Sequence, residues 1–414
     1  MNDRTILVVG TFDTKNDELD YIAGCIRTQG GGVVTMDVSV LGDPAEPTDI
    51  SKHQVAEAGG HSITEAIASG DENTAMQIMA RGAAACARDL CDSARIHGVV
   101  VLGGTMGTDL ALDLCQALPL GVPKYVVSTV SFSPLISPDR LAPDIQMILW
   151  AGGLYGLNAI CKAALSQAAG AVLGAARAVE HPAATRPVVG MTSLGSSCLS
   201  YMKSLKPALE SRGFEVAIFH ATGMGGAAFE RIAGAGAFAC VMDFALPELG
   251  NWMAGSVVSC GPDRLRAAGR AGIPQIVAPG CLDLIDFAGW QDIPERYADR
   301  PFHAHNRLIK SSGLNAEERR ATARELATRL AEARGPAHVI LPRGGLEEWD
   351  RPGGAAHDAE ALEAFCAELS ASVSPPVQLT EIEAHINDAA FAETALAIFD
   401  GWLDAGIIPA PTQG

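Results

Sequence analysis

Residues 5–10 read TILVVG and residues 11–15 read TFDTK, and these two runs predict how the chain begins to fold. The first run is apolar enough for a buried strand. In the segment after it, apolar residues at i, i+3, i+4 and i+7 from Leu19 form one face of a helix. Glycines at 30–32 end that helix, and 33–38 follows as a second strand. A strand, a helix and another strand in this order are typical of a parallel sheet covered by helices.

The same alternation continues to the end of the chain. Further strands are predicted at 98–102, 124–129, 188–193, 215–221, 237–244, 273–278, 338–341 and 377–382. Two helices are expected after Pro47, and a long helix over 143–179 carries small residues near Gly152 that would let a helix or another subunit approach closely. Residues 181–187 are the best linker. We therefore predict an α/β protein of two Rossmann-like, doubly wound domains with mostly parallel sheets, residues 1–182 and 187–414.

Composition and charge limit the partners of this chain. Hydrophobic residues make up 48% of the 414 residues and charged ones 19%, so a sizeable core is possible. The net charge is −18 and no lysine-rich stripe is present, which disfavours nucleic acid and membrane surfaces. A small anion such as ATP remains possible, because backbone N–H groups and a divalent cation can hold it locally.

The cysteines and the apolar segments favour a cytoplasmic protein. The ten cysteines form no CxxC pair, so we expect mostly buried free thiols, and Cys198 lacks the sequence context of a nucleophile. Residues 1–10 lack the basic and long apolar parts of a signal peptide. The stretch 159–179 includes Lys162 and Arg177, which predicts a packing helix and not a membrane span.

The loop after the first strand carries groups that suit a phosphate with a metal ion. Its hydroxyls, carboxylate and ammonium belong to Thr11, Asp13, Thr14 and Lys15. Ligands of open α/β sheets sit where such strands end. The loop matches neither GxxxxGK[ST] nor GxGxxG. The alternative is that Asp13 or Thr14 caps the helix and that Lys15 is solvated.

A second loop of this kind follows the strand at 98–102. It offers Gly103, Gly104, Thr105, Gly107 and Thr108, where glycines permit close backbone approach to an anion and threonines add donors. The alternative is a tight turn between a strand and a helix. Two such loops in one domain favour a ligand site more strongly than one loop alone does.

The second half of the sequence has its own candidate loops. One resembles an oxyanion cradle and contains Thr222, Gly223, Gly225 and Gly226. Another, at 194–198, offers Ser197, which is also a good helix N-cap. Carboxylates and imidazoles gather later in the chain: Asp243, Glu248, Asp283, Asp286, His303 and His305. They could form a divalent metal site, although ordinary surface or hydrogen-bonded histidines are the favoured reading.

Five ordered motifs together resemble one family. They are GTFDTK at 10–15, GGTMGT at 103–108, GLNAI at 156–160, FHATGMGG at 219–226 and HIND at 385–388. The sequence is similar to the ATP-binding domain family shared by a tomato-mosaic-virus resistance protein and many uncharacterised bacterial proteins. The resemblance implies two Rossmann-like domains, ATP and magnesium binding in the first, and a homodimer. In the plant protein the domain inhibits viral replication, a role that we do not carry over.

Carried onto this sequence, the resemblance implies nucleotide contacts from the two glycine- and threonine-rich loops and from Ser128 and Thr129 at a strand end. Where relatives have threonines before a glutamate, this chain has FALP at 244–247 before Glu248, which weakens any polar ligand role there. The leading expectation is binding of ATP with Mg²⁺, in an enzyme acting on a small carbonyl or organic acid in the cleft between domains. The alternative is a non-catalytic nucleotide sensor that regulates a protein partner.

Overall fold

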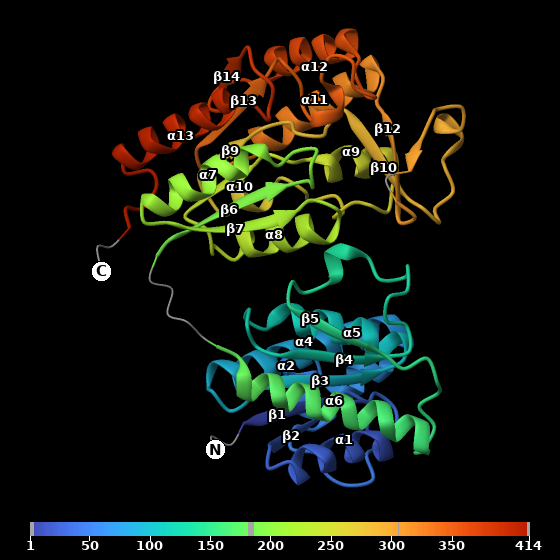
Figure 1. The fold of residues 1–414 in the computed structure, drawn as a ribbon. Helices are drawn as coiled ribbons and strands as arrows, with labels where there is room; N and C mark the ends of the chain where they lie inside the picture. The colour runs from blue at the N-terminus through green and yellow to red at the C-terminus, as the bar shows by residue number, and fades with distance from the viewer. Residues whose placement is uncertain (1–3, 181–185, 305, 412–414) are drawn as a thin grey trace. The chain divides into compact units, whose positions relative to one another are not determined.

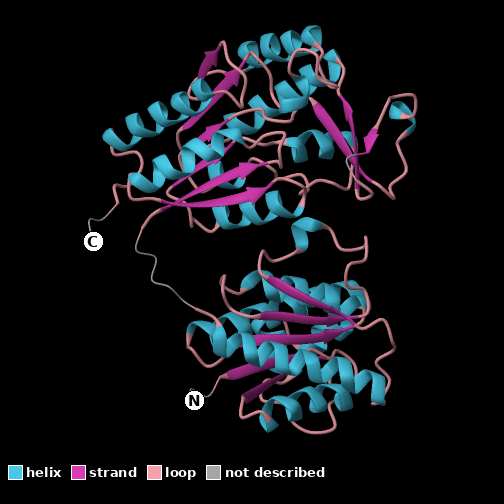
Figure 2. Ribbon diagram, viewed as in Figure 1, coloured by secondary structure: helices cyan, strands magenta, loops and turns pink. Residues whose placement is uncertain are grey.

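The computed structural model describes residues 4–180, 186–304 and 306–411. The chain divides into two compact units, Met1–Pro182 and Ala183–Gly414, which we call the N-terminal and C-terminal domains (Figure 1). Each has a parallel sheet with helices on both faces (Figure 2). The predicted fold class, an α/β protein of two Rossmann-like domains, is confirmed.

The N-terminal domain has a five-stranded parallel sheet in the order β2-β1-β3-β4-β5. Its elements are β1 (Thr5–Gly10), α1 (Asn16–Thr28), β2 (Gly32–Asp37), α2 (Lys52–Ala58), α3 (Ile63–Ala68), α4 (Glu72–Asp92), β3 (Gly98–Gly103), α5 (Thr105–Ala117), β4 (Lys124–Ser128), β5 (Ile145–Leu149) and α6 (Ala159–Ala178). The order corresponds to the flavodoxin-like pattern, in which strand order reverses between the first and third strands.

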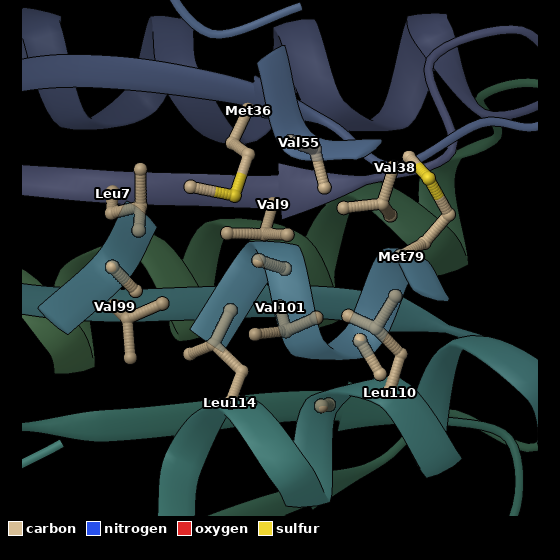
Figure 3. Close-up of a cluster of buried hydrophobic side chains, with 14 of the residues drawn as sticks. Leu7, Val9, Met36, Val38, Val55, Met79, Val99, Val101, Leu110 and Leu114 are labelled. Atoms are coloured by element: carbon tan, nitrogen blue, oxygen red, sulfur yellow. The ribbon is translucent and has the colours of Figure 1, made fainter. Parts of the chain in front are cut away.

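Alternate side chains of the central strands supply two cores. Leu7, Val9, Val99 and Val101 pack with Leu110 and Leu114 of α5, as Figure 3 shows. Their neighbours Ile6, Val8, Val100 and Leu102 face the opposite way and pack against α1 and α6. Both faces are buried because side chains alternate along a strand, so these strands are apolar throughout. Helices α1 and α5 therefore cover opposite faces of the sheet.

The C-terminal domain has a six-stranded parallel sheet in the order β14-β13-β9-β8-β6-β7 and a small antiparallel sheet in the order β10-β12-β11. Its strands are β6 (Val188–Ser193), β7 (Glu215–His220), β8 (Cys240–Asp243), β9 (Gln275–Val277), β10 (Leu284–Ala288), β11 (His303–Ala304), β12 (Ile309–Gly313), β13 (Ala337–Pro342) and β14 (Gln378–Ile382). Its helices are α7 (Ser200–Ser211), α8 (Met224–Gly234), α9 (Pro247–Ala254), α10 (Ala267–Arg270), α11 (Ala316–Ala331), α12 (Ala359–Ser372) and α13 (Ala389–Asp404).

Several predicted elements differ from the structure. The predicted helix over 143–179 is wrong in its first part, because 145–149 is strand β5 and the helix begins only at Ala159. As an edge strand β5 is only partly buried, so it lacks the apolar run of the central strands. Three helices, not two, follow Pro47, and the antiparallel sheet was not predicted. Most of the predicted linker lies outside the described residues.

The ten cysteines and helix α6 also agree with what the sequence predicts of them. All ten cysteines are free, and seven of them are buried. Helix α6 is long and apolar enough to span a membrane by length and composition, with a mean hydropathy of 1.3. Its Cys161, Leu165 and Val172 are nevertheless buried in the core against the sheet. The packing role predicted for this segment accounts for its apolar face.

Candidate functional site

The carboxyl ends of β1 and β3 form the point in the N-terminal domain where ligand sites of this topology lie. The strands are neighbours, with Val9 opposite Val101. From β1 the chain passes to α1 on one face of the sheet, and from β3 it passes to α5 on the other. A crevice opens where two connections leave a sheet in opposite directions. The two loops singled out in the sequence therefore meet at this point.

A cavity of about 700 Å³ lies at these loops, a size typical of small-molecule sites. Part of its lining is polar and comes from the loops after β1 and β3: Thr11, Asp13, Thr14, Lys15, Gly103, Gly104, Thr105, Met106 and Gly107. Another part is mostly apolar and comes from the segment after β2 and from α3 and α4: Val38, Val40, Leu41, Ala66, Ile67, Ala75 and Met76. Ser69, Gly70, Asp71 and Glu72 complete the lining.

The ammonium of Lys15 is held by neutral groups. Its Nζ donates to the hydroxyls of Thr11 and Thr14, each at 3.2 Å. Within the described part of the chain no carboxylate lies within ion-pair distance of this Nζ. A cation bound only to hydroxyls keeps its charge available to an anion.

Asp13 is positioned by contacts that leave one of its oxygens free. Its backbone N–H donates to Ser39 Oγ at 3.1 Å, and its Oδ2 accepts from the N–H of Gly42 at 3.2 Å. Its Oδ1 is buried and has no hydrogen-bond partner. Helix α1 begins after Lys15 without a side-chain cap, so neither Asp13 nor Thr14 has the alternative capping role. Asp13 is thus a fixed carboxylate that lines the cavity.

The loop after β3 turns directly into α5. A Cβ at Gly103 would lie 2.6 Å from the backbone carbon of Gly107, so only glycine permits this close turn. Gly104 is the N-cap, and no side chain caps the helix. The first N–H groups of α5 and the positive end of its dipole therefore lie at the cavity, an arrangement that attracts anions.

Thr108, Ser128 and Thr129 lie in two different places. The hydroxyls of Thr108 and Ser128 are 2.6 Å apart and buried, and Thr108 also donates to the Gly104 carbonyl at 2.7 Å. These bonds fix the start of α5 on β4. Thr129 instead lines an adjacent hollow of about 460 Å³ with Thr14, Lys15 and Tyr155. Contacts of these three residues with a nucleotide stay a prediction.

Magnesium fits this site in the way it usually binds beside phosphates. Within the described residues no group of three or more His, Cys, Asp or Glu side chains could hold a metal ion. The unpartnered oxygen of Asp13 can supply one ligand. Mg²⁺ commonly takes one or two carboxylates and completes its octahedron with phosphate oxygens and water. The residues present fit a metal that arrives with a nucleotide.

The glycine loop after β7 in the C-terminal domain already holds an internal anion. The N–H groups of Gly223 and Gly226 donate to Glu248 Oε1 at 2.5 and 3.0 Å. Gly223 has φ of +92°, and a Cβ at Gly226 would lie 1.8 Å from Glu248 Oε2. Thr222 precedes this loop, and Gly225 packs against the His220 carbonyl. The predicted cradle has the expected geometry, with a side chain of the same chain in it.

Arg264 binds the carboxylates at this point. Its fully buried guanidinium pairs with Asp243 at 2.5 Å, Glu248 at 2.8 Å and Glu230 at 3.0 Å. Burial raises the pKa of Glu248 to about 7, although Arg264 and the two glycine N–H groups oppose this shift. Asp243 and Glu248 thus belong to a buried ionic network. Contact of these residues with a ligand stays a prediction.

The other acidic and imidazole candidates are spread over separate places. Asp286 accepts from Ser311 at 2.5 Å and from Asn251 at 3.2 Å. His303 is exposed on β11 with its ring 5.5 Å from that of Trp349, and His305 lies outside the described residues. Cys198 is buried, and its thiol contacts the Phe244 carbonyl at 3.3 Å.

Sequence reasoning singled out Asp283 but missed the buried groups beside it at the carboxyl ends of β9, β13 and β14. We call Asp283, Glu347, Asp350 and His385 the acid cluster. His385 Nε2 lies 3.1 Å from Asp350 Oδ1 and 2.8 Å from the Glu347 carbonyl. Burial raises the pKa of Asp283 to about 7, and burial together with the charge of Asp283 raises that of Glu347 to about 9. The HIND motif at 385–388 was a signal for this cluster that had been given no role.

These features define a class: a two-domain α/β protein with an anion-attracting cavity at the strand-order reversal of its first sheet. The chain belongs to the UPF0261 family, as the sequence resemblance predicted. The N-terminal domain model of this uncharacterised protein family matches residues 4–181, and its C-terminal domain model matches residues 186–403.

Relatives cover nearly the whole chain. A UPF0261 protein of Brucella melitensis biotype 1 is 54% identical over 98% of this chain and 97% of its own length. One from Clostridium tetani is 33% identical over 94% and 96%. The ToMV resistance protein Tm-1 of Solanum lycopersicum is 28% identical over 97% of this chain, which matches 56% of that protein.

Proposed function

We propose that the N-terminal domain binds ATP together with Mg²⁺ in the cavity at the ends of β1 and β3. The observation that carries the proposal is the convergence of three groups on one cavity: the Lys15 ammonium, the uncapped start of α5 and the Asp13 carboxylate, whose buried Oδ1 has no hydrogen-bond partner. An ammonium and helix N–H groups suit phosphates, and a carboxylate suits the magnesium ion that accompanies them.

The rest of the cavity suits the nucleoside. Apolar side chains such as Val40, Ile67 and Met76 offer a surface for a flat base. Asp71 precedes α4 and is part of the cavity lining. Hydrogen bonds from Thr74 lower its pKa, so it offers the cavity an ionised hydrogen-bond acceptor. A ligand with a charged end and an apolar end matches this division, whereas inorganic phosphate would use only the polar half.

Isothermal titration of the full-length protein with ATP, in the presence and absence of Mg²⁺, tests the proposal. Lys15→Met removes the charge and keeps most of the side-chain volume, and it should weaken ATP binding at least tenfold. Lys203→Met is the matched control, because Lys203 is exposed on α7 in the other domain. Equal affinity of the wild type and the Lys15 variant would refute the site, and so would no detectable binding by the wild type.

The nucleotide site could serve either of two functions. We propose an enzyme that uses ATP to act on a small carbonyl compound or organic acid, and the alternative is a sensor in which nucleotide binding controls docking of a protein partner. Release of ADP only when a metabolite is added favours the enzyme. Retention of ATP without turnover favours the sensor. The homodimer and the cytoplasmic location stay predictions of the sequence and of the resemblance.

A further inference from the structure

A second cavity lies in the C-terminal domain and takes no part in the proposed nucleotide site. It has a volume of about 900 Å³, and it is lined by the end of β12, the first turn of α11 and the segments before β11 and α12. Its lining includes Phe302, Ser312, Arg319 and Trp349. The wall thus combines aromatic rings with a hydroxyl and a guanidinium.

Arg319 is the unusual member of this lining. Its side chain is 1% exposed, yet within the residues that the structure describes it forms no ion pair. Its Nε donates to the Leu314 carbonyl at 3.0 Å, while Nη1 is buried without a hydrogen-bond partner. Arginine is almost never fully buried unless it is paired, because an uncompensated buried charge costs several kcal/mol.

The position of Arg319 in its helix adds to this cost. It lies in the first turn of α11, where the positive end of the helix dipole favours acidic side chains and disfavours cations. The helix has a capping box between Asn315 and Glu318 that satisfies its first N–H groups, and a guanidinium, which only donates hydrogen bonds, has no such role there. A cation kept at such a position is well explained by an anion that binds there.

The other charged groups of the lining have partners. Arg300 pairs with Glu318 through two bonds of 2.6 and 2.7 Å, and Asp358 caps α12 by accepting from the N–H of Ala361 at 2.9 Å. His357 contacts the Asp350 carbonyl at 2.8 Å. Among the lining arginines and acids, Arg319 is therefore the charged group without an ion pair or carboxylate hydrogen bond within the described residues.

Asp283 of the acid cluster lies close to Arg319 without pairing with it. The Leu314 carbonyl accepts from Arg319, and the Leu314 N–H donates to the Asp283 carbonyl at 2.8 Å. Both carboxyl oxygens of Asp283 are buried and have no hydrogen-bond partner. Burial favours its neutral form, so the group can stand near a second carboxylate with little repulsion at or below neutral pH.

We propose that this cavity binds a small organic monocarboxylate whose carboxylate pairs with Arg319 and whose apolar or aromatic body lies against Phe302 and Trp349. A planar guanidinium binds a carboxylate through two parallel hydrogen bonds. Arg319 has no ion pair among the described residues, whereas Arg300 of the lining is already paired with Glu318, so the cavity suits a single negative charge better than a phosphate dianion. The Ser312 hydroxyl, which has no partner among the described residues, adds a donor at the wall. The proposal does not rest on nucleotide binding, because every residue in it belongs to the C-terminal domain.

The test uses the full-length protein without nucleotide. Benzoate, phenylacetate and hexanoate are the probes, with benzamide as the uncharged analogue of benzoate and inorganic phosphate as the competing anion. We expect at least one carboxylate to raise the melting temperature of the wild type and to bind in isothermal titration, and benzamide to bind at least tenfold more weakly than benzoate. Binding of phosphate alone, equal binding of benzamide and benzoate, or no binding by any of the three acids would overturn the proposal.

Variants locate the binding. Arg319→Met should weaken carboxylate binding at least tenfold, while Arg320→Met should not, because the neighbouring Arg320 is partly exposed and pairs with Glu317 at 3.5 Å. Ser312→Ala should weaken binding of the carboxylate about threefold. This second variant still tests the site if the Arg319 variant does not fold. Lys15→Met should bind the acid as the wild type does, which separates this site from the nucleotide site. Unchanged affinity in both the Arg319 and Ser312 variants would overturn the assignment.

Discussion

Replacing Asp283 by asparagine should make the unfolding free energy of the C-terminal domain depend less on pH between pH 5 and pH 8. Burial raises the pKa of this carboxyl from 3.8 to about 7, because the loss of water outweighs the opposing effect of the Arg319 charge. A raised pKa means that the folded chain binds the proton more tightly than the unfolded chain. The stabilising contribution is complete below the unfolded pKa and is lost as the pH rises through the folded one.

The size of the effect follows from the pKa difference. One pKa unit corresponds to about 1.4 kcal/mol, so a shift of about three units corresponds to roughly 4 kcal/mol of unfolding free energy. About 3 kcal/mol of this should be lost between pH 5 and pH 8 in the wild type and retained in Asp283→Asn. The variant should keep a weaker pH dependence, because Glu347 still titrates with a pKa that burial raises.

Urea unfolding at pH 5, 6, 7 and 8, followed by tryptophan fluorescence, measures this difference. Four of the five tryptophans, including Trp349 beside the acid cluster, lie in the C-terminal domain. The asparagine amide lowers stability by a similar amount at every pH. The comparison therefore uses the slope of unfolding free energy against pH and not its absolute value. Asp404→Asn, at the exposed end of α13, is the matched control and should follow the wild type. Equal slopes for Asp283→Asn and the wild type would refute the reasoning.

Three further substitutions test the packing of the buried Arg264 network and of the nucleotide site. Gly226→Ala places a Cβ 1.8 Å from the Glu248 carboxylate, so circular dichroism should show destabilisation of about 3 kcal/mol or more, and a change under 1 kcal/mol would contradict this packing. Arg264→Met leaves three buried carboxylates without their cation and should lower the unfolding free energy by about 3–5 kcal/mol in urea titrations, with the loss greater at pH 8 than at pH 5. Gly103→Ala pushes a Cβ against the backbone of Gly107, and calorimetry should show weaker ATP binding with carboxylate binding unchanged.

The sequence alone determined the strands that are buried on both faces. Runs such as 5–10 and 188–193 are short, mostly apolar segments, and they match β1 and β6 residue for residue. Their order with the intervening helices also determined the fold class. The two loops of the nucleotide proposal could be found in the same way, because glycines and threonines directly after a buried strand mark the edge where ligands bind.

Only the tertiary structure decided which polar groups already have partners. Sequence reasoning treated Gly223 and Glu248 as possible ligand contacts, but they bind each other across 25 positions of the chain. Arg319 was not singled out in the sequence, and folding buries it with its Nη1 lacking a hydrogen-bond partner. Local patterns record the spacing of apolar side chains, whereas the pairing of buried charges depends on segments that are distant in sequence and meet only in the folded chain.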